Sequence, residues 1–161
     1  MKKSEFLLVD TPGQLELFAF RELGNKIISM IREDVSSDVA VFLIDATQIR
    51  KPSDVVMGIL LALAIRFHLN INVVSVLNKV DLAGSQVMRM FEEFFSNTSN
   101  FSKFVAQDFG VFGEMSSQLV NVLKAFVPPT RVVAISALKN RGMEDLFSII
   151  HDAICTCGDM T

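Results

Sequence analysis

The stretch "NVVSVLNKVDL", from Asn72 to Leu82, decides the fold because an apolar run passes directly into a polar turn. Its first part, "NVVSVL" (72–77), is rich in Val and Leu and predicts a strand buried on both faces. Asn78, Lys79 and Asp81 follow at once. In parallel sheets, ligands gather at the carboxyl ends of the strands, so these three residues are candidates for a binding site.

Three other apolar runs have the same character: "FLLV" (6–9), "VAVFLI" (39–44) and "RVVAI" (131–135). Helical patterns follow the four runs, at roughly residues 14–33, 53–69, 82–96 and 141–154. This alternation predicts an α/β fold, with a mainly parallel sheet flanked by helices and strands that are buried on both faces. We expect a single domain over residues 1–161.

The segment from residue 85 to 128 interrupts this alternation. It predicts two or three short helices, packed locally as a helical insertion before the last strand. A docking surface for a partner is the alternative. Its eight phenylalanines lie among Ser and Asn: Phe91, Phe94, Phe95, Phe101, Phe104, Phe109, Phe112 and Phe126.

The helix expected at 53–69 is apolar on opposite faces. Ser53, just after Pro52, is the predicted N-cap. A helix that is apolar all round needs cover on every side, from its own domain or from a second subunit.

Composition argues against several classes of partner. The net charge is −3 and no Lys/Arg run exceeds two residues, so we expect no nucleic-acid surface. The longest apolar run, "VVMGILLALAI" (55–65), has 11 residues and is too short to span a bilayer. We expect no secretory signal, and Cys155 and Cys157 are expected to be reduced thiols rather than metal ligands. A cytoplasmic location is the resulting expectation.

The sequence Asp10-Thr11-Pro12-Gly13 follows the first predicted strand. A carboxylate such as that of Asp10 can hold the water shell of a Mg²⁺ ion. Gly13 would let a backbone N–H approach a terminal phosphate closely. Simple turn chemistry explains the same residues equally well.

The Asn-Lys-x-Asp sequence after the 72–77 strand is more specific. The Asp81 carboxylate can accept two hydrogen bonds, from guanine N1–H and from the exocyclic amine, and adenine offers no such pair of donors. The stem of Lys79 can lie along base and ribose, while Asn78 ties the loop together. In "ISALKN", the turn at Ser136-Ala137 would present a backbone N–H to the guanine oxygen.

These three motifs, in this order, are similar to the guanine-nucleotide motifs of P-loop GTPases. The stretch "DTPGQLELF" (10–18) followed by "FRELG" (20–24) resembles the GPN-loop GTPases in particular, and the resemblance covers essentially the whole chain.

The resemblance implies GTP hydrolysis, with GTP or GDP and Mg²⁺ as ligands, and a homodimer linked to RNA polymerase assembly. It implies that Asp10 is the acid beside Mg²⁺, that Gly13 contacts the terminal phosphate and that Gln14 orients the attacking water. Asn78, Lys79, Asp81, Ser136 and Ala137 would then contact guanine.

Two family motifs are absent from these residues. A phosphate loop needs G-x-x-x-x-G-K-[ST], and no glycine of the chain precedes a lysine. The Gly-Pro-Asn segment is absent too. We therefore expect a partial P-loop NTPase-like three-layer sandwich that is truncated at its N-terminus. It would be inactive alone, with a gap or unpaired edges in its sheet, and would fold poorly, repack its strands or need the missing half in trans.

Two alternatives remain open. The chain could be a non-catalytic interaction or assembly subunit derived from a GPN-loop GTPase. It could also be another P-loop GTPase with an Asp-Thr-Pro-Gly loop, for ribosome assembly or metal insertion. The run "GQLELF" (13–18) and the phenylalanine-rich insertion argue against the latter.

Overall fold

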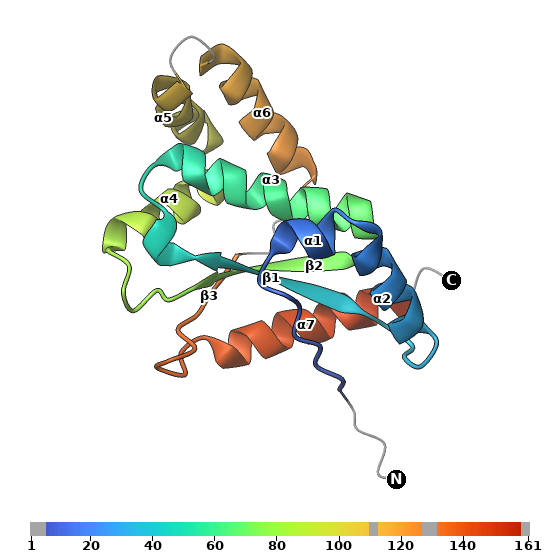
Figure 1. Cartoon of the computed structure of the whole chain (residues 1–161). Helices are drawn as coiled ribbons and strands as arrows, with labels where there is room; N and C mark the ends of the chain where they lie inside the picture. The colour runs from blue at the N-terminus through green and yellow to red at the C-terminus, as the bar shows by residue number, and fades with distance from the viewer. Residues whose placement is uncertain (1–5, 110–112, 127–131, 159–161) are drawn as a thin grey trace. The chain divides into compact units, whose positions relative to one another are not determined.

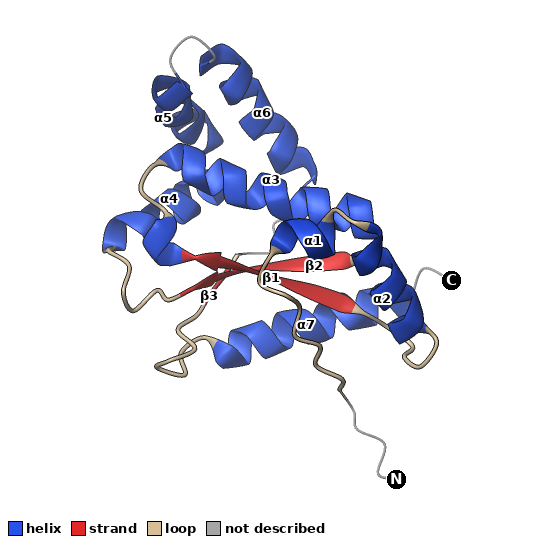
Figure 2. Cartoon of the chain, viewed as in Figure 1, coloured by secondary structure: helices blue, strands red, loops and turns tan. Residues whose placement is uncertain are grey.

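The computed structural model describes residues 6–109, 113–126 and 132–158. The chain divides into two compact units, residues 1–36 and 37–161. Figure 1 gives the order of the elements along the chain, and Figure 2 shows strands and helices in separate colours.

The first unit contains two short helices, α1 (Leu15–Ala19) and α2 (Glu22–Arg32). The single helix expected over residues 14–33 is therefore interrupted. Arg21 has an extended backbone, with φ −115° and ψ 164°, which cannot continue the helical hydrogen bonds. Helix α2 buries Gly24 and Ile28.

The prediction of a buried strand at residues 6–9 is wrong for this structure. These four residues form no strand, and all four side chains are exposed, that of Leu8 to 92%. A strand depends on hydrogen bonds from a neighbouring strand, and none of the described strands pairs with these residues.

The second unit is built on a parallel sheet, as predicted. Its strands are β1 (Val39–Asp45), β2 (Asn72–Asn78) and β3 (Val133–Ala134), in the order β1-β2-β3. Both pairs are parallel, and the register of β1 with β2 runs from Val39 opposite Asn72 to Asp45 opposite Asn78. Residue 131, at the start of the predicted last strand, lies outside the described residues.

Two apolar cores lie on opposite faces of this sheet. Helix α3 (Pro52–Leu69) covers one face and packs Val55, Val56 and Ile59 against Leu77 of β2. Helix α7 (Met143–Gly158) covers the other, where Val74 and Val76 meet Leu146. Alternate residues of β2 serve the two cores, as the pleat of a strand requires.

Strand β1 departs from the expectation that strands are buried on both faces. Val41 is 40% exposed and Leu43 is 57% exposed. Both lie on the same side of β1, whereas the core beneath α7 is built mainly on β2 and β3. Among the described strands β1 also lies at the edge of the sheet.

Helix α3 begins one residue earlier than expected. Lys51, not Ser53, is its N-cap, and Pro52 occupies the first helical turn, where a missing N–H is tolerated. The Asp54 carboxylate accepts the backbone N–H groups of Arg50 and Lys51 at 2.9 and 3.1 Å. Met57 and Phe67 stay exposed, so the helix is not covered on every side.

The expectation that this part of the chain is too short to span a bilayer considered only the 11-residue run 55–65. The whole of α3, among the described helices, is long and apolar enough to cross a membrane by length and composition. Its residues Val55, Val56, Ile59 and Ala62 are buried in the molecule. The core helix of a sheet protein has the same length and apolar composition, so this property alone is not evidence for a membrane role.

The helical insertion forms α4 (Ser85–Ser96), α5 (Thr98–Phe109) and α6 (Gly113–Phe126). Phe94 and Phe101 are fully buried, with ring centroids 5.3 Å apart and planes at 87°, and they extend the core beneath α3. A Cβ at Gly113 would lie 2.5 Å from the Ala106 carbonyl oxygen, so glycine permits the close approach of α6 to α5. Phe112 and the side chains of Phe109 and Phe126 lie outside the described residues.

We expect Phe94→Ala to lower the free energy of unfolding by about 3–5 kcal/mol, because a fully buried ring would leave a cavity between α4, α5 and α3. Urea unfolding followed by circular dichroism measures this loss. Phe104→Ala, in the same insertion but at a ring that is 48% exposed, is the matched control and should lose much less. Equal losses for the two variants would contradict this account of the insertion.

Candidate functional site

The candidate site lies at the carboxyl edge of the sheet in the second unit. Backbone hydrogen bonds join Ile135, directly after β3, to the end of β2 and to the loop that follows it: Ile135 N–H donates to Leu77 O at 2.8 Å, and Val80 N–H donates to Ile135 O at 3.2 Å. The register of β1 and β2 places Asp45 opposite Asn78 at the same edge. Three loops that are distant in sequence therefore meet here.

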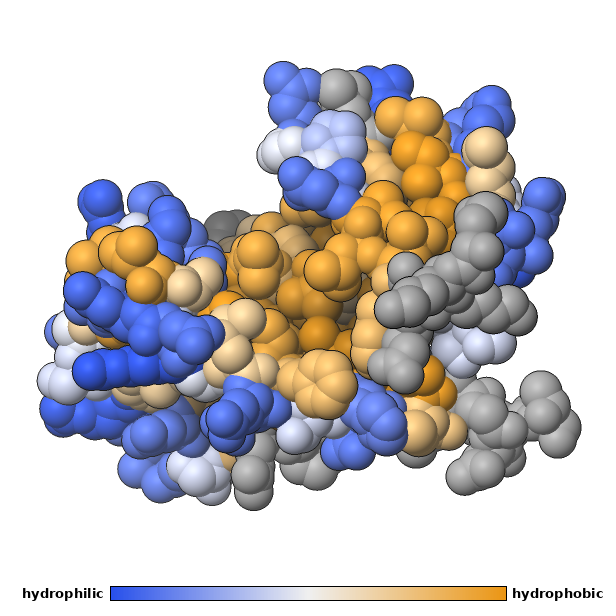
Figure 3. All heavy atoms as spheres, turned by 90° about the horizontal axis from the view of Figure 1, so that it is seen from below, coloured by the Kyte–Doolittle hydropathy of each residue, from blue (hydrophilic) through white to orange (hydrophobic). Residues whose placement is uncertain are grey.

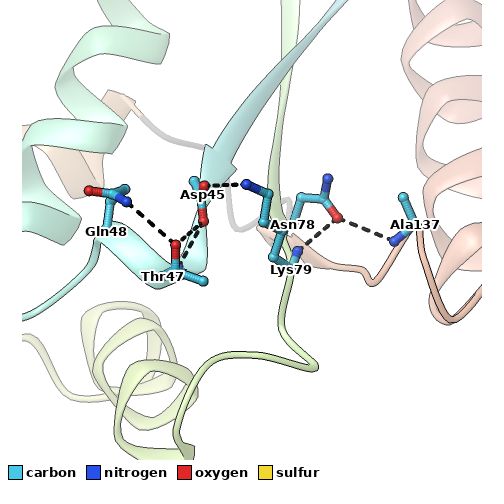
Figure 4. Close-up of polar contacts among 6 residues, drawn as sticks. All are labelled: Asp45, Thr47, Gln48, Asn78, Lys79 and Ala137. Carbon is cyan, nitrogen blue, oxygen red and sulfur yellow. Dashed lines mark hydrogen bonds and ion pairs between the residues drawn. The ribbon is translucent and has the colours of Figure 1, made fainter.

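Asn78 connects two of these loops through one atom (Figure 4). Its Oδ1 accepts the backbone N–H of Lys79 at 2.7 Å and that of Ala137 at 3.2 Å. The Asn-Lys-x-Asp sequence and the Ser-Ala turn, which are separate motifs in the sequence, are thus linked.

Lys79 is held in an unusual backbone conformation, with φ 64°. Residues other than glycine rarely adopt this left-handed region. Its Nζ donates to Asp45 Oδ2 at 2.6 Å, and the two side chains are 51% and 31% exposed. The turn closes where Leu82 N–H donates to Lys79 O at 3.0 Å, and Asp81, within this turn, is half-buried.

Asp45 was not among the residues singled out from the sequence. Its Oδ1 accepts the backbone N–H of Thr47 at 2.9 Å and the Thr47 hydroxyl at 2.7 Å. The hydrogen bond from Lys79 is the main reason that the pKa of Asp45 is lowered to about 2, and the Thr47 hydrogen bond lowers this pKa further. A signal was present, because Asp45 ends the apolar run of β1 as Asn78 ends that of β2.

Ser136 and Ala137 lie in a compact turn after β3. Ser136 is fully buried and exchanges two backbone hydrogen bonds of 3.1 Å with Arg141, while its Oγ accepts Lys139 N–H at 3.1 Å. Gly142, with φ 72°, closes the turn, and a Cβ there would overlap the Ala134 carbonyl oxygen. Ala137 and the neighbouring Leu138 are exposed at the tip of this turn.

Asp10, Gly13 and Gln14 belong to the first unit and lie in an exposed segment before α1. The Gln14 carbonyl accepts Phe18 N–H at 3.4 Å. A Cβ at Gly13 would meet no atom within 4 Å, so no neighbouring group in this structure requires glycine at that position.

Within the described parts of the chain, no three His, Cys, Asp or Glu side chains lie close enough to hold a metal ion together. Cys155 is exposed on α7, with its Sγ 3.6 Å from His151 Nδ1. The Cys157 side chain lies outside the described residues.

A family model described as "conserved hypothetical ATP binding protein" matches residues 1–156. The chain is 30% identical over 160 residues to GPN-loop GTPase PAB0955 of Pyrococcus abyssi. The aligned region covers 99% of this chain and 63% of that protein. The chain belongs to the GPN-loop GTPase family. The resemblance inferred from its motifs is therefore confirmed.

Other comparisons agree with this family. The chain is 25% identical over 146 residues to GPN-loop GTPase 1 of Dictyostelium discoideum, covering 91% of this chain and 36% of that protein. The crystal structure of PAB0955, a GTPase in apo form, aligns with a TM-score of 0.76 and 29% identity over 92% of this chain and 58% of that one. The fold is shared, and the chain spans less than two thirds of the length of these relatives.

In this GPN-loop family member, the Asp45 carboxyl should titrate with a midpoint near pH 2. NMR of the side-chain carbonyl carbon as a function of pH measures this midpoint. Because folding lowers this pKa, the stabilising contribution is fully present above about pH 4 and is lost as pH falls through 2. Lys79→Met should raise the midpoint toward the ordinary value of 3.8, although Thr47 will keep it lower. Lys139→Met is the control, and a midpoint that stays near 2 in Lys79→Met would refute the ion pair.

Asn78→Ala should speed amide hydrogen exchange at Lys79 and Ala137 by roughly two- to tenfold, because both N–H groups lose their acceptor. Asn78→Asp keeps an acceptor oxygen in place and should exchange more slowly than Asn78→Ala at both amides. Exchange measured by NMR that is unchanged at Ala137 in Asn78→Ala would show that Asn78 does not join the two loops.

Proposed function

We propose that this chain carries the guanine-reading loops of a GTP-hydrolysing site. The observation that carries this proposal is the shared contact of Asn78 Oδ1 with Lys79 N–H and Ala137 N–H, which joins two guanine-type motifs at one edge of a parallel sheet. Ligands bind at this edge in related folds. The names of the relatives as GTPases support the same reading.

Within the proposed site, Asp81 would accept the N1–H and exocyclic amine of guanine, and the Lys79 stem would lie along base and ribose. The Ala137 N–H is already donated to Asn78. Binding of the guanine oxygen at that amide therefore requires the amide to share the bond or leave Asn78.

The description of the matched family model names ATP binding, whereas the relatives are named GTPases. The chemistry of Asp81 favours guanine, because adenine has no pair of donors at the corresponding edge. Binding of adenine would bury the Asp81 acceptor without a partner, which costs about 1–3 kcal/mol of binding free energy.

For the phosphate side we propose that Asp10 holds Mg²⁺ through its water shell, that Gly13 contacts the terminal phosphate and that Gln14 orients water. A single exposed carboxylate suits Mg²⁺, which keeps several waters and takes its other ligands from nucleotide phosphates. When bound, the ion would neutralise charge on the phosphates. Because the 161 residues contain no G-x-x-x-x-G-K-[ST] sequence, we propose that the chain alone does not hydrolyse GTP.

The resemblance further suggests a cytoplasmic homodimer that acts with the RNA polymerase assembly machinery. A second candidate function is that of a non-catalytic interaction or assembly subunit. The exposed apolar side chains Val41, Leu43, Phe104 and Met115 favour it, and Figure 3 shows a broad apolar area on one face.

Calorimetric titration of GTP, GDP and ATP with Mg²⁺ tests these proposals, first with this chain and then with a supplied polypeptide that carries a phosphate loop. We expect GTP and GDP to bind weakly to the chain and more tightly when that polypeptide is present, and ATP to bind in neither case. If no nucleotide binds in either sample, the assembly role becomes the better account.

Asp81→Asn should weaken GDP binding by roughly 5- to 150-fold, since the amide replaces one of the two acceptor oxygens with an NH2 donor that faces a guanine donor. The same variant should bind xanthosine diphosphate better than the unmodified chain does, because xanthine presents an acceptor where guanine presents its amine. Glu144→Gln, an exposed carboxylate on α7, is the control. Unchanged base preference in Asp81→Asn would remove Asp81 from the site.

A further inference from the structure

The side chain of Lys79 is held by a residue from a different strand. Its Nζ donates at 2.6 Å to Oδ2 of Asp45, which lies 34 positions earlier in the chain. The pairing of β1 with β2 explains this contact, because Asp45 and Asn78 are partners at the last position of the register. None of the guanine-type motifs includes Asp45.

Asp45 is itself fixed in place (Figure 4). One carboxylate oxygen, Oδ1, accepts both the N–H and the hydroxyl of Thr47, in the short η1 helix (Ala46–Gln48) that follows β1. The other oxygen, Oδ2, is directed to Lys79. Asp45 therefore presents an anchored acceptor to the lysine, rather than a freely rotating one.

Lys79 is also fixed at its backbone. Its N–H donates to Asn78 Oδ1 at 2.7 Å, and its φ of 64° lies in the left-handed region, which residues other than glycine rarely occupy. With the backbone and the ammonium both held, the four-carbon stem between them has little rotational freedom. A free lysine side chain has a large rotamer entropy, which binding would otherwise have to reduce.

We propose that Asp45 is a positioning residue for guanine-nucleotide binding, which acts by holding the Lys79 ammonium so that the lysine stem is preorganised along base and ribose. Asp45 acts through Lys79 and does not touch the ligand. This inference rests on the proposed function, because it assigns Asp45 a role in the same site. A side chain that is ordered before binding loses less entropy when the ligand arrives.

A double-mutant cycle tests this inference, with GDP titrated into the ¹⁵N-labelled full chain and amide shifts followed at Lys79, Val80 and Ala137. NMR titration suits the weak binding expected of this chain. Asp45→Asn should weaken GDP binding by roughly two- to fivefold, the range expected for a partly exposed ion pair. In the Lys79→Met background, the same substitution should have no further effect.

The direction of the effect is diagnostic. Loss of the Asp45 negative charge, taken alone, would favour an anionic nucleotide. A weaker affinity in Asp45→Asn therefore reports the loss of lysine positioning, and a stronger affinity would overturn the inference. Glu22→Gln removes the negative charge of another exposed ion pair, in which Lys26 Nζ lies 3.2 Å from Glu22, and should leave GDP binding unchanged.

A second measurement requires no nucleotide. An immobilised lysine stem gives distinct shifts for its two Hε protons, and these should merge in Asp45→Asn while the amide spectrum of the core stays unchanged. Distinct Hε shifts that persist in Asp45→Asn would overturn the positioning role.

The titration also separates this inference from the function on which it rests. If the unmodified chain binds neither GDP nor GTP at millimolar concentration, alone or with the supplied polypeptide that carries a phosphate loop, the proposed function and the positioning role both fail. If the unmodified chain binds GDP and Asp45→Asn binds it equally well, only the positioning role fails. Effects of Asp45→Asn that are equal in the presence and absence of Lys79 would also refute it, because Asp45 would then act independently.

Discussion

The parallel pairing of β1 with β2 is the constraint on which the candidate site depends. Its register ends with Asp45 opposite Asn78, so two polar strand ends are brought together by backbone hydrogen bonds alone. The contacts of Lys79 with Asp45 and of Asn78 with Ala137 follow from this placement. A shift of one residue in this register would turn the side chains of β1 to the opposite faces of the sheet.

Packing on both faces of the sheet holds that register. Leu77 belongs to the core beneath α3, and Val74 and Val76 belong to the core beneath α7, so β2 cannot slip without exposing both. The helical insertion enlarges the first core through Phe94 and Phe101. Strand β1 is less covered, because Val41 and Leu43 remain exposed.

The polar contacts of the site position groups more than they stabilise the fold. Asp45 and Lys79 are partly exposed, and ion pairs of this kind contribute at most about 1 kcal/mol to folding. Their value lies in geometry: Asp45 is anchored by Thr47, Lys79 is anchored by Asn78, and the contact between them closes the arrangement. Such preorganisation suits binding of a ligand by a small number of side chains.

The sequence by itself determined the α/β class, the strands near residues 39–44 and 72–77, and the motifs around Asn78 and Ser136, because local apolar runs and turn residues are sufficient to indicate them. It could not show that residues 6–9 form no strand, since a strand requires a partner that local sequence does not reveal. The N-cap at Lys51 was missed because Ser53 is the commoner capping residue, whereas Pro52 and Asp54 decide the helix start. Only the tertiary structure brought Asp45 to Lys79, because strand register, not sequence distance, sets which polar side chains meet at the edge of a sheet.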